Sequence, residues 1–198
     1  MSKDMNRRGL FKTCAAAGAI VIAGDFLKGG SPVAYGEVNT AIDNVYNAAK
    51  TVFTFFYAYT NTVAQEIGRE RAVGLTTRMF ENMGAMRGKM IKEQAGGKEF
   101  DAKAAWSPIK IAKDTIGQNY EVVEEGPQRV VVRLSRCPIY EAARTLGIEA
   151  NTIEAGCRAG PVRFTDTVVK QLNPNLNVRL EKFRSTPDDF CEEAITLT

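Results

Sequence analysis

Residues 120–135 read YEVVEEGPQRVVVRLS, and this stretch decides the fold. It contains two short runs rich in β-branched and aromatic residues, which favour an extended strand over a helix. Gly126-Pro127 lies between the runs and is a typical turn signal. The stretch therefore predicts a β-hairpin with strands at about 120–125 and 129–135.

A second hairpin is expected at the C-terminal end of the chain. Two strands at about 176–184 and 189–197 flank Pro187-Asp188-Asp189, which are turn residues. Two hairpins in one domain most simply pair into a four-stranded antiparallel sheet with helices packed on one face. The expected fold class is therefore α+β, with a helical N-terminal half.

Apolar residues recur at helical spacing through most of the remaining chain. The expected helices span about 41–67, 69–94, 101–116, 138–146 and 151–172. Gly160-Pro161 should kink or split the last helix, because proline has no backbone N–H. The second helix carries a methionine stripe, which predicts adaptable core or the wall of an apolar pocket rather than a copper site. Its members are Met79, Met83, Met86 and Met90.

The N-terminus predicts export. Asn6-Arg7-Arg8-Gly9-Leu10-Phe11-Lys12 has the form of a twin-arginine motif, and the apolar stretch Ala15 to Gly24 follows it. That stretch is too short to span a bilayer, which needs about 20 apolar residues. We expect a signal at 1–36, a single domain at 37–198, the twin-arginine translocase as a partner and a periplasmic location. The alternative is a disordered basic tail with a chance arginine pair.

Composition excludes two classes of function. The whole chain has a formal net charge of +3 and contains no histidine. Residues 1–36 hold five basic and two acidic side chains, so the rest of the chain is near neutral. We therefore expect no nucleic-acid partner, because such proteins present a basic surface. The absence of imidazole excludes Ser-His-Asp chemistry, so any thiol or carboxylate chemistry must work without a histidine.

Cys137 is the leading candidate for chemistry. It precedes Pro138, and proline is favoured at the first position of a helix. Cys137 is then expected near the N-cap, where the helix dipole favours a thiolate. Glu141 lies four residues on and could share the same face as a proton acceptor. The alternative is a buried cysteine that packs as a small hydrophobic residue, with Glu141 in solvent.

Two further cysteines, Cys157 and Cys191, lie far from Cys137 in the sequence. Each alone is expected to pack in the core. Their spacing does not match the close cysteine pairs of structural zinc sites, so no metal and no other cofactor is predicted. Two alternatives stay open: a metal site of the three thiols with an Asp or Glu, and a disulfide, which an exported protein permits.

The order of these residues resembles a known family. Cys137-Pro138 with Glu141, then Cys157, Asp166, the segment LNPNL at 172–176 and Asp188-Asp189 with Cys191 are similar to the L-2-amino-thiazoline-4-carboxylic acid hydrolase family. The resemblance covers roughly 45–198 and is sharpest from Arg133 onward. It implies opening of a cyclic amidine by addition of water across C=N. That reaction needs a nucleophile or activated water, a proton donor and an anchor for the substrate carboxylate.

The resemblance also implies roles for individual residues. Cys137 would be the nucleophile or assist the base, and Glu141 or Asp166 would be the acid or base. Arg136, Asn173 and Arg184 would bind the small-molecule substrate. The structural alternatives are a helix C-cap for Asn173, a surface carboxylate for Asp166 and ion pairs for the arginines.

Two other functions remain alternatives. One is a non-enzymatic accessory subunit or ligand-binding module beside a membrane or periplasmic redox complex. The other is a cysteine-based metal or redox sensor, which needs Cys137, Cys157 and Cys191 to converge in space.

Overall fold

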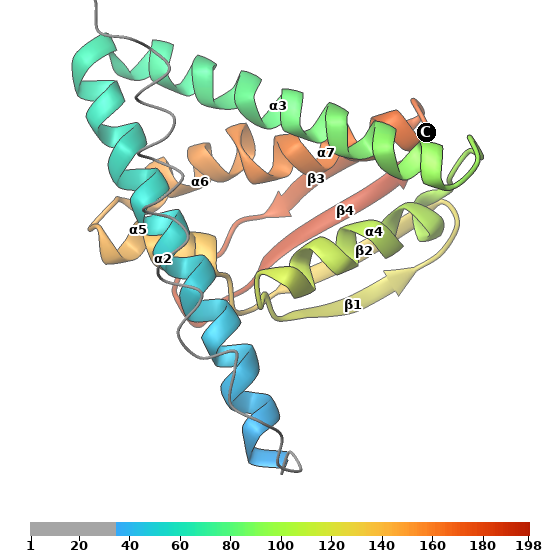
Figure 1. Cartoon of the computed structure of the whole chain (residues 1–198), viewed down its shortest axis with the longest axis horizontal. Helices are drawn as coiled ribbons and strands as arrows, with labels where there is room; N and C mark the ends of the chain where they lie inside the picture. The colour runs from blue at the N-terminus through green and yellow to red at the C-terminus, as the bar shows by residue number, and fades with distance from the viewer. Residues whose placement is uncertain (1–34) are drawn as a thin grey trace, which may run out of the picture. The chain divides into compact units, whose positions relative to one another are not determined.

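The computed structural model describes residues 35–198, of which Asn39–Thr198 form one compact unit. The export signal expected at 1–36 lies almost entirely outside the described residues. Figure 1 shows the elements in chain order. Their bounds are α2 Tyr35–Ile67, α3 Arg69–Gln94, α4 Ala102–Thr115, β1 Tyr120–Glu125, β2 Arg129–Leu134, α5 Pro138–Thr145, α6 Ala150–Ala159, α7 Pro161–Leu172, β3 Leu176–Lys182 and β4 Cys191–Leu197.

The four strands form one antiparallel sheet in the order β1-β2-β4-β3. The two hairpins join through β2 and β4, where Val132 lies opposite Glu193 and Leu134 opposite Cys191. This pairing places the valine-rich strand inside the sheet, in keeping with the burial of its three valines. The structure confirms the predicted α+β fold with two hairpins in one sheet.

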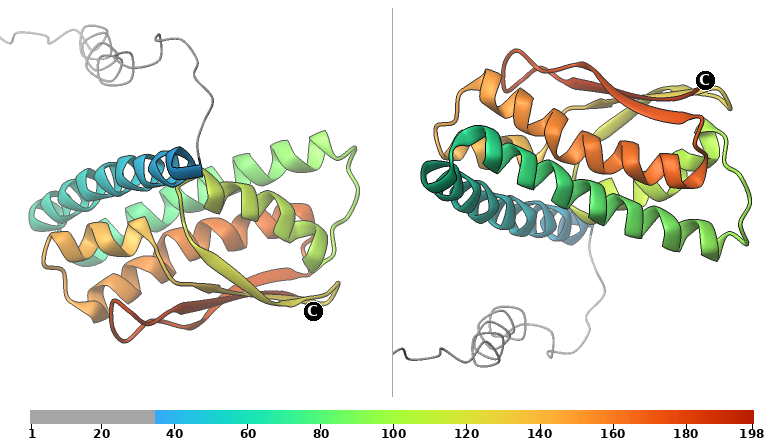
Figure 2. Two further views of the ribbon diagram at one scale, coloured as in Figure 1. Left: turned by 90° about the horizontal axis from the view of Figure 1, so that it is seen from below. Right: turned by 90° about the horizontal axis from the view of Figure 1, so that it is seen from above.

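The helices cover one face of the sheet in two layers (Figure 2). Helices α4 and α7 lie against the strands, α3 packs along α7, and α2 lies in the outer layer, where it diverges from α3 beyond their connected ends (Figure 1). The main core fills the space between the inner helices and the sheet. Its members include Trp106, Ile109, Leu134, Val168, Val169, Leu172, Leu176, Leu180 and Ile195.

The predicted break at Gly160-Pro161 is confirmed, because α6 ends at Ala159 and α7 begins at Pro161. Gly160 also lies against Phe80 of α3, where an added Cβ would come within 2.8 Å of the ring. Any larger residue at this position would require the Phe80 ring to shift, so glycine allows the break to pack closely against α3. Helix α2 differs from expectation at its start, since it begins at Tyr35 rather than near residue 41.

The methionine stripe lies largely at the surface of α3 and not in the core. Its four side chains are 38–63% exposed. Met83 also lines a cavity, so the expectation of a pocket wall holds at that position. No helix in residues 35–198 is long and apolar enough to cross a membrane.

Candidate functional site

The three cysteines of the described residues line one cavity of about 380 Å³ between the helices and the sheet. We call it the thiol cavity. Its walls are mainly apolar, and they come from segments far apart in the sequence. They include Phe53, Phe80, Met83, Ile109, Leu134, Cys137, Ile139, Tyr140, Cys157, Pro161, Val162, Phe164, Leu180, Phe183 and Cys191.

An ion pair also faces this cavity. Lys113, in the last turn of α4, donates to Glu193 of β4 over 2.8 Å. Both residues are buried, at 8% and 9% exposure. Removing two charges from water costs several kcal/mol per ion and is only partly offset by their attraction. A charged pair in an apolar cavity is therefore a candidate for function as well as structure.

Cys137 lies at the N-cap of α5 with extended backbone, as predicted, and Pro138 occupies the first turn. Its thiol is free and buried. Burial raises the pKa of the Cys137 thiol, while the amides of Tyr140 and Ile139 and the charges of Arg184 and Lys113 oppose this shift. Because burial dominates, the helix N-terminus does not make Cys137 a thiolate at neutral pH.

Cys157 of α6 and Cys191 of β4 are also free thiols. Burial raises the pKa of Cys157 well above its usual range, with further contributions from Cys137, Cys191 and Glu193. The three cysteines thus share one cavity, as the sensor hypothesis requires. However, no three His, Cys, Asp or Glu side chains within residues 35–198 are arranged to hold a metal ion.

Two other predicted site residues lie outside the thiol cavity. Glu141 of α5 is half-buried and pairs with Arg144 at 3.7 Å. Arg136 donates to Asp43 of α2 at 2.6 Å, and its guanidinium carbon lies 3.7 Å from the Tyr46 ring centroid. The observed contacts of Arg136 therefore join α2 to the segment that precedes α5.

Asp166 and Asn173 of α7 make contacts that hold local structure. Asp166 accepts a hydrogen bond from the backbone N–H of Val178 at 3.0 Å and from Lys170 at 2.7 Å. Asn173 is the C-cap of α7, donates to the carbonyl of Phe100 and accepts from the amide of Asn175. The cap alternative for Asn173 is confirmed, whereas Asp166 is buried and not a surface carboxylate.

Arg184 lies behind one wall of the thiol cavity. It is 2% exposed and donates to the carbonyls of Leu134 and Ser135 at 2.7 and 2.8 Å. Its Nε donates to the sulfur of Cys191 at 3.4 Å, and the guanidinium lies over the Tyr140 ring. The guanidinium is therefore already in contact with protein groups on several sides. Arg184 also does not line the thiol cavity.

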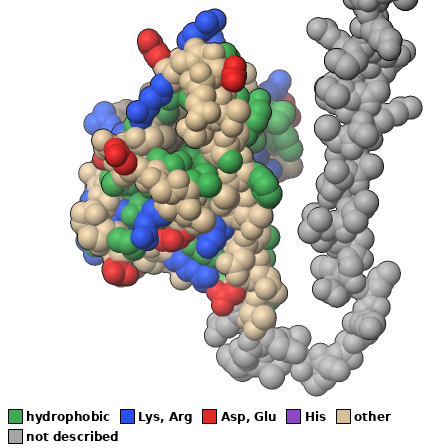
Figure 3. All heavy atoms as spheres, turned by 90° about the vertical axis from the view of Figure 1, so that its left-hand side faces the viewer, with side chains coloured by type: hydrophobic (Ala, Val, Ile, Leu, Met, Phe, Trp, Pro, Cys, Tyr) green, Lys and Arg blue, Asp and Glu red, His purple; other side chains and the backbone are tan. Residues whose placement is uncertain are grey.

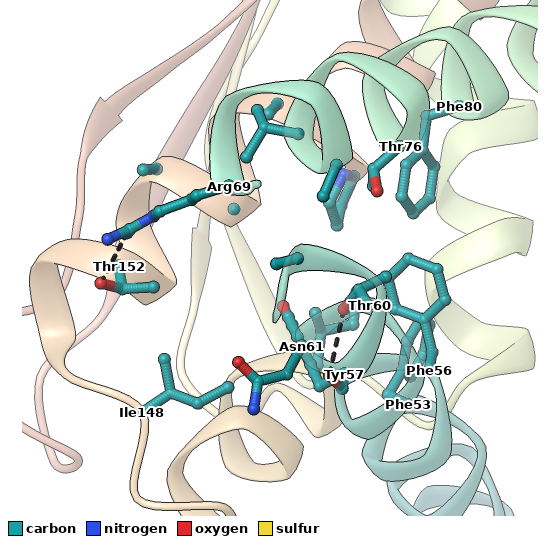
Figure 4. Close-up of a pocket in the computed structure, with 18 of the residues that line it drawn as sticks. Phe53, Phe56, Tyr57, Thr60, Asn61, Arg69, Thr76, Phe80, Ile148 and Thr152 are labelled. Carbon is teal, nitrogen blue, oxygen red and sulfur yellow. Dashed lines mark hydrogen bonds between the residues drawn. The ribbon is translucent and has the colours of Figure 1, made fainter. Parts of the chain in front are cut away.

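A second cavity, of about 410 Å³, lies between α2, α3 and α6 (Figure 4). We call it the groove. Phe53, Phe56, Phe80 and Ile148 contribute apolar walls, and Phe53 and Phe80 line the thiol cavity too. Figure 3 faces the end of the molecule where α2 meets α3, and it shows exposed hydrophobic side chains with charged ones around them.

Polar groups of the groove are few, and the structure places them along its sides. Arg69, the first residue of α3, donates to Thr152 of α6 at 2.9 Å. Thr60 donates to the carbonyl of Tyr57 at 3.0 Å. Burial raises the pKa of Tyr57, so this phenol stays neutral across the physiological range. Figure 4 shows Arg69 reaching from α3 toward Thr152 at one side of the groove.

Comparison with known families decides the identity at the level of the family. The family model of the L-2-amino-thiazoline-4-carboxylic acid hydrolases matches residues 48–193. The chain belongs to this family. The matched range contains the thiol cavity with Lys113 and Glu193, and all residues that line the groove, so both cavities lie within the hydrolase-family domain.

Comparison with individual proteins adds little for this family member. A search of curated proteins found no match. Among solved structures, the chain is similar to a trafficking protein particle complex subunit 3 from Naegleria fowleri, covalently bound to palmitic acid, with 13% identity and a TM-score of 0.44. The similarity covers 76% of this chain and 95% of that one.

Sequence reasoning missed Lys113 and Glu193. The signal for Glu193 was present, because residues two apart in a strand face the same side of the sheet and Cys191 was expected to pack in the core. Lys113 gave no such signal, since a lysine near a helix end is usually solvated. Only the pairing of β4 with β2 brings its carboxylate partner beneath α4.

Proposed function

We propose that this family member hydrolyses a C=N bond of a small cyclic amidine in the thiol cavity, with Lys113 and Glu193 as the acid–base pair. The observation that carries the proposal is the buried ion pair in a cavity lined mainly by apolar groups and thiols. Membership of a hydrolase family supports the reaction class. The proposal moves the acid–base role from Glu141 and Asp166, which make their contacts elsewhere.

The reaction balances with these two groups and one water molecule. The Glu193 carboxylate accepts a proton as the water oxygen bonds to the C=N carbon, and the Lys113 ammonium protonates the nitrogen. The adduct then loses its hydroxyl proton to the Lys113 amine and forms a carbonyl. The bond from that carbon to the ring heteroatom breaks, and the heteroatom takes the proton held by Glu193. Both residues return to their starting states.

The cavity favours a substrate without a carboxylate. Among the residues that line it, Lys113 is the single cation, and Glu193 already pairs with it. Arg136 and Arg184 do not line the cavity, so neither is placed to anchor a substrate anion there. Burial of apolar substituents against an apolar wall is favourable, by about 25 cal/mol for each Å² of apolar surface removed from water. We therefore propose a cyclic amidine with apolar substituents as the substrate class.

Cys137 takes a different role in this scheme from the predicted nucleophile. Its raised pKa keeps the thiol protonated at neutral pH, and a neutral thiol is a weak nucleophile. We propose that Cys137 contacts the substrate and shapes the cavity.

The test is turnover of a panel of 2-amino-thiazolines, with and without a 4-carboxylate, followed by mass spectrometry of the ring-opened product. We expect Glu193→Gln to lower the rate by about 100-fold or more, as for loss of a general base. The matched control is Glu192→Gln on the same strand, because Glu192 pairs with Arg133 near the surface. Its rate should stay within about twofold of the wild type.

Two results would contradict the proposal. One is absence of turnover across the whole panel by the folded wild-type protein. The other is equal loss of rate in Glu193→Gln and Glu192→Gln. Thermal unfolding of each variant separates loss of chemistry from loss of fold.

A non-catalytic ligand-binding module is the second candidate. Burial keeps Cys137 and Cys157 as neutral thiols, and this favours an inert apolar cavity. This candidate predicts binding of apolar probes without turnover. In that role the protein would act beside a membrane or periplasmic redox complex, as the export motif suggests.

We also propose that the protein reaches the periplasm through the twin-arginine translocase. The motif around Arg7 and Arg8 supports this location. Cell fractionation of the full chain tests it against an Arg7→Lys/Arg8→Lys variant. We expect the wild type in the periplasmic fraction and the variant in the cytoplasmic one; equal distribution of the two would contradict export by this route.

A further inference from the structure

We propose that the groove between α2, α3 and α6 binds an anionic amphiphile, a molecule with a carboxylate head and an apolar chain such as a medium-chain fatty acid. The proposal concerns a different site from the proposed hydrolysis and does not depend on it. It rests on the shape of the groove, its apolar walls and the position of one cation.

The apolar part of the ligand follows from the walls. The groove has the volume of a ligand pocket, which is usually 300–1,000 Å³. Phe56 and Phe80 meet edge to face at 5.8 Å between ring centroids and belong to opposite sides, α2 and α3. Phe53 and Ile148 extend the apolar surface (Figure 4). Leaving such a surface in contact with water is unfavourable, so an apolar chain stabilises it.

The charge of the head group follows from Arg69. Arg69 is the single charged side chain among the residues that line the groove. Its Nη2 donates to the hydroxyl of Thr152, and no carboxylate within residues 35–198 forms a salt bridge with it. The neighbouring acidic side chains Glu66 and Glu70 are exposed and do not line the groove. The remaining guanidinium donors suit a carboxylate, which accepts two parallel hydrogen bonds from arginine.

The polar rim agrees with this choice. Its other polar members are uncharged: Tyr57, Thr60, Asn61, Gln65, Thr76 and Thr152. Hydroxyl and amide groups can donate to a carboxylate oxygen or remain in water. A cationic amphiphile would meet unfavourable charge at Arg69, and a neutral one would forgo the ionic contact.

The probe for the test is 11-(dansylamino)undecanoic acid, whose fluorescence rises in an apolar site. We expect saturable binding to the purified protein and displacement by laurate, with 1-dodecanol at least about tenfold weaker as a competitor. Arg69→Met should weaken the probe by about tenfold or more, as expected for a lost charged hydrogen bond. Arg69→Lys should restore part of the affinity, because it keeps the charge.

Three controls make the result specific. Arg78→Met changes an exposed arginine of the same helix that does not line the groove, and should leave binding within about twofold. Ala155→Trp places a large side chain in the groove and should abolish binding while the unfolding temperature is retained. Glu193→Gln changes the thiol cavity and should leave probe binding unchanged, so the two proposals can fail separately.

The proposal is wrong if Arg69→Met and Arg78→Met bind the probe equally, or if 1-dodecanol competes as well as laurate. Binding that survives in the Ala155→Trp variant would place the probe elsewhere and would also overturn it.

Discussion

The charged guanidinium of Arg184 is buried. Its nitrogens donate hydrogen bonds to backbone carbonyls and to the sulfur of Cys191. Arginine suits this position because its planar group presents five donors in a fixed arrangement and stacks on an aromatic ring. The Tyr140 ring supplies that face. The residue therefore ties the end of β3 to the end of β2, and its contacts stabilise one wall of the thiol cavity.

We expect Arg184→Met to lower the free energy of unfolding by about 2–4 kcal/mol, because it leaves buried carbonyls without donors. The matched control is Arg179→Met on β3, where the side chain is exposed and the change should stay within about 0.5 kcal/mol. Urea unfolding followed by circular dichroism measures both. Equal stability of the two variants would show that the buried hydrogen bonds contribute little.

At the scale of single residues, the sequence predicted helix caps correctly. It did not predict the surroundings of side chains whose partners lie on distant elements. The N-cap at Cys137, the proline that begins α5 and the C-cap at Asn173 all follow from a few neighbouring residues. The surroundings of Asp166 and Arg184 do not, because their partners lie on other elements. The catalytic and substrate-binding roles implied by the family resemblance stay predictions.

Helix α3 contacts α7 through glycines, and this explains why its methionines lie outside. Gly84 and Gly88 are buried against α7, where an added Cβ would come within 2.7 Å of the Phe164 carbonyl and 2.6 Å of Gln171 Cβ, respectively. Close approach of two helix backbones requires residues without side chains at the contact. The apolar stripe was predicted to be the buried or pocket-lining face, but the small residues occupy the contact with α7.

We expect Gly84→Ala and Gly88→Ala to destabilise the fold by about 1–3 kcal/mol each, because the new methyl groups meet backbone or Cβ atoms that cannot move alone. Gly74→Ala on the same helix is the control. Nothing lies within 4 Å of its added Cβ, so alanine should stabilise the helix by about 0.5–1 kcal/mol. Thermal unfolding of the three variants tests the contact; a stabilising effect at Gly84 and Gly88 would contradict it.

The whole molecule buries several groups that ionise at high pH. Burial raises the pKa of Cys137, Cys157 and Tyr57 above their ordinary values. Above the ordinary pKa of a group, the unfolded chain loses that proton while the folded chain retains it. The folded state then binds more protons, so stability falls as pH rises.

We therefore expect full stability below about pH 8.5, the ordinary pKa of cysteine, and a loss above it of about 1.4 kcal/mol per pH unit for each of the two thiols Cys137 and Cys157. Urea unfolding under reducing conditions from pH 7 to 10.5 measures the slope. Cys157→Ala removes one of these groups and should flatten the curve. A stability that rises over this range would contradict the assigned burial.

The sequence by itself determined the elements and the fold class. The run of β-branched valines at 130–132, the Gly126-Pro127 turn and the Gly160-Pro161 break act through neighbouring atoms, so they can be read from short segments. Only the tertiary structure decided which polar groups are buried and where the cavities lie. Lys113 and Glu193 are 80 residues apart, and they meet because the register of β2 with β4 turns Glu193 beneath α4. The groove likewise needs three helices to assemble, because a cavity is the space left between packed elements and belongs to none of them alone.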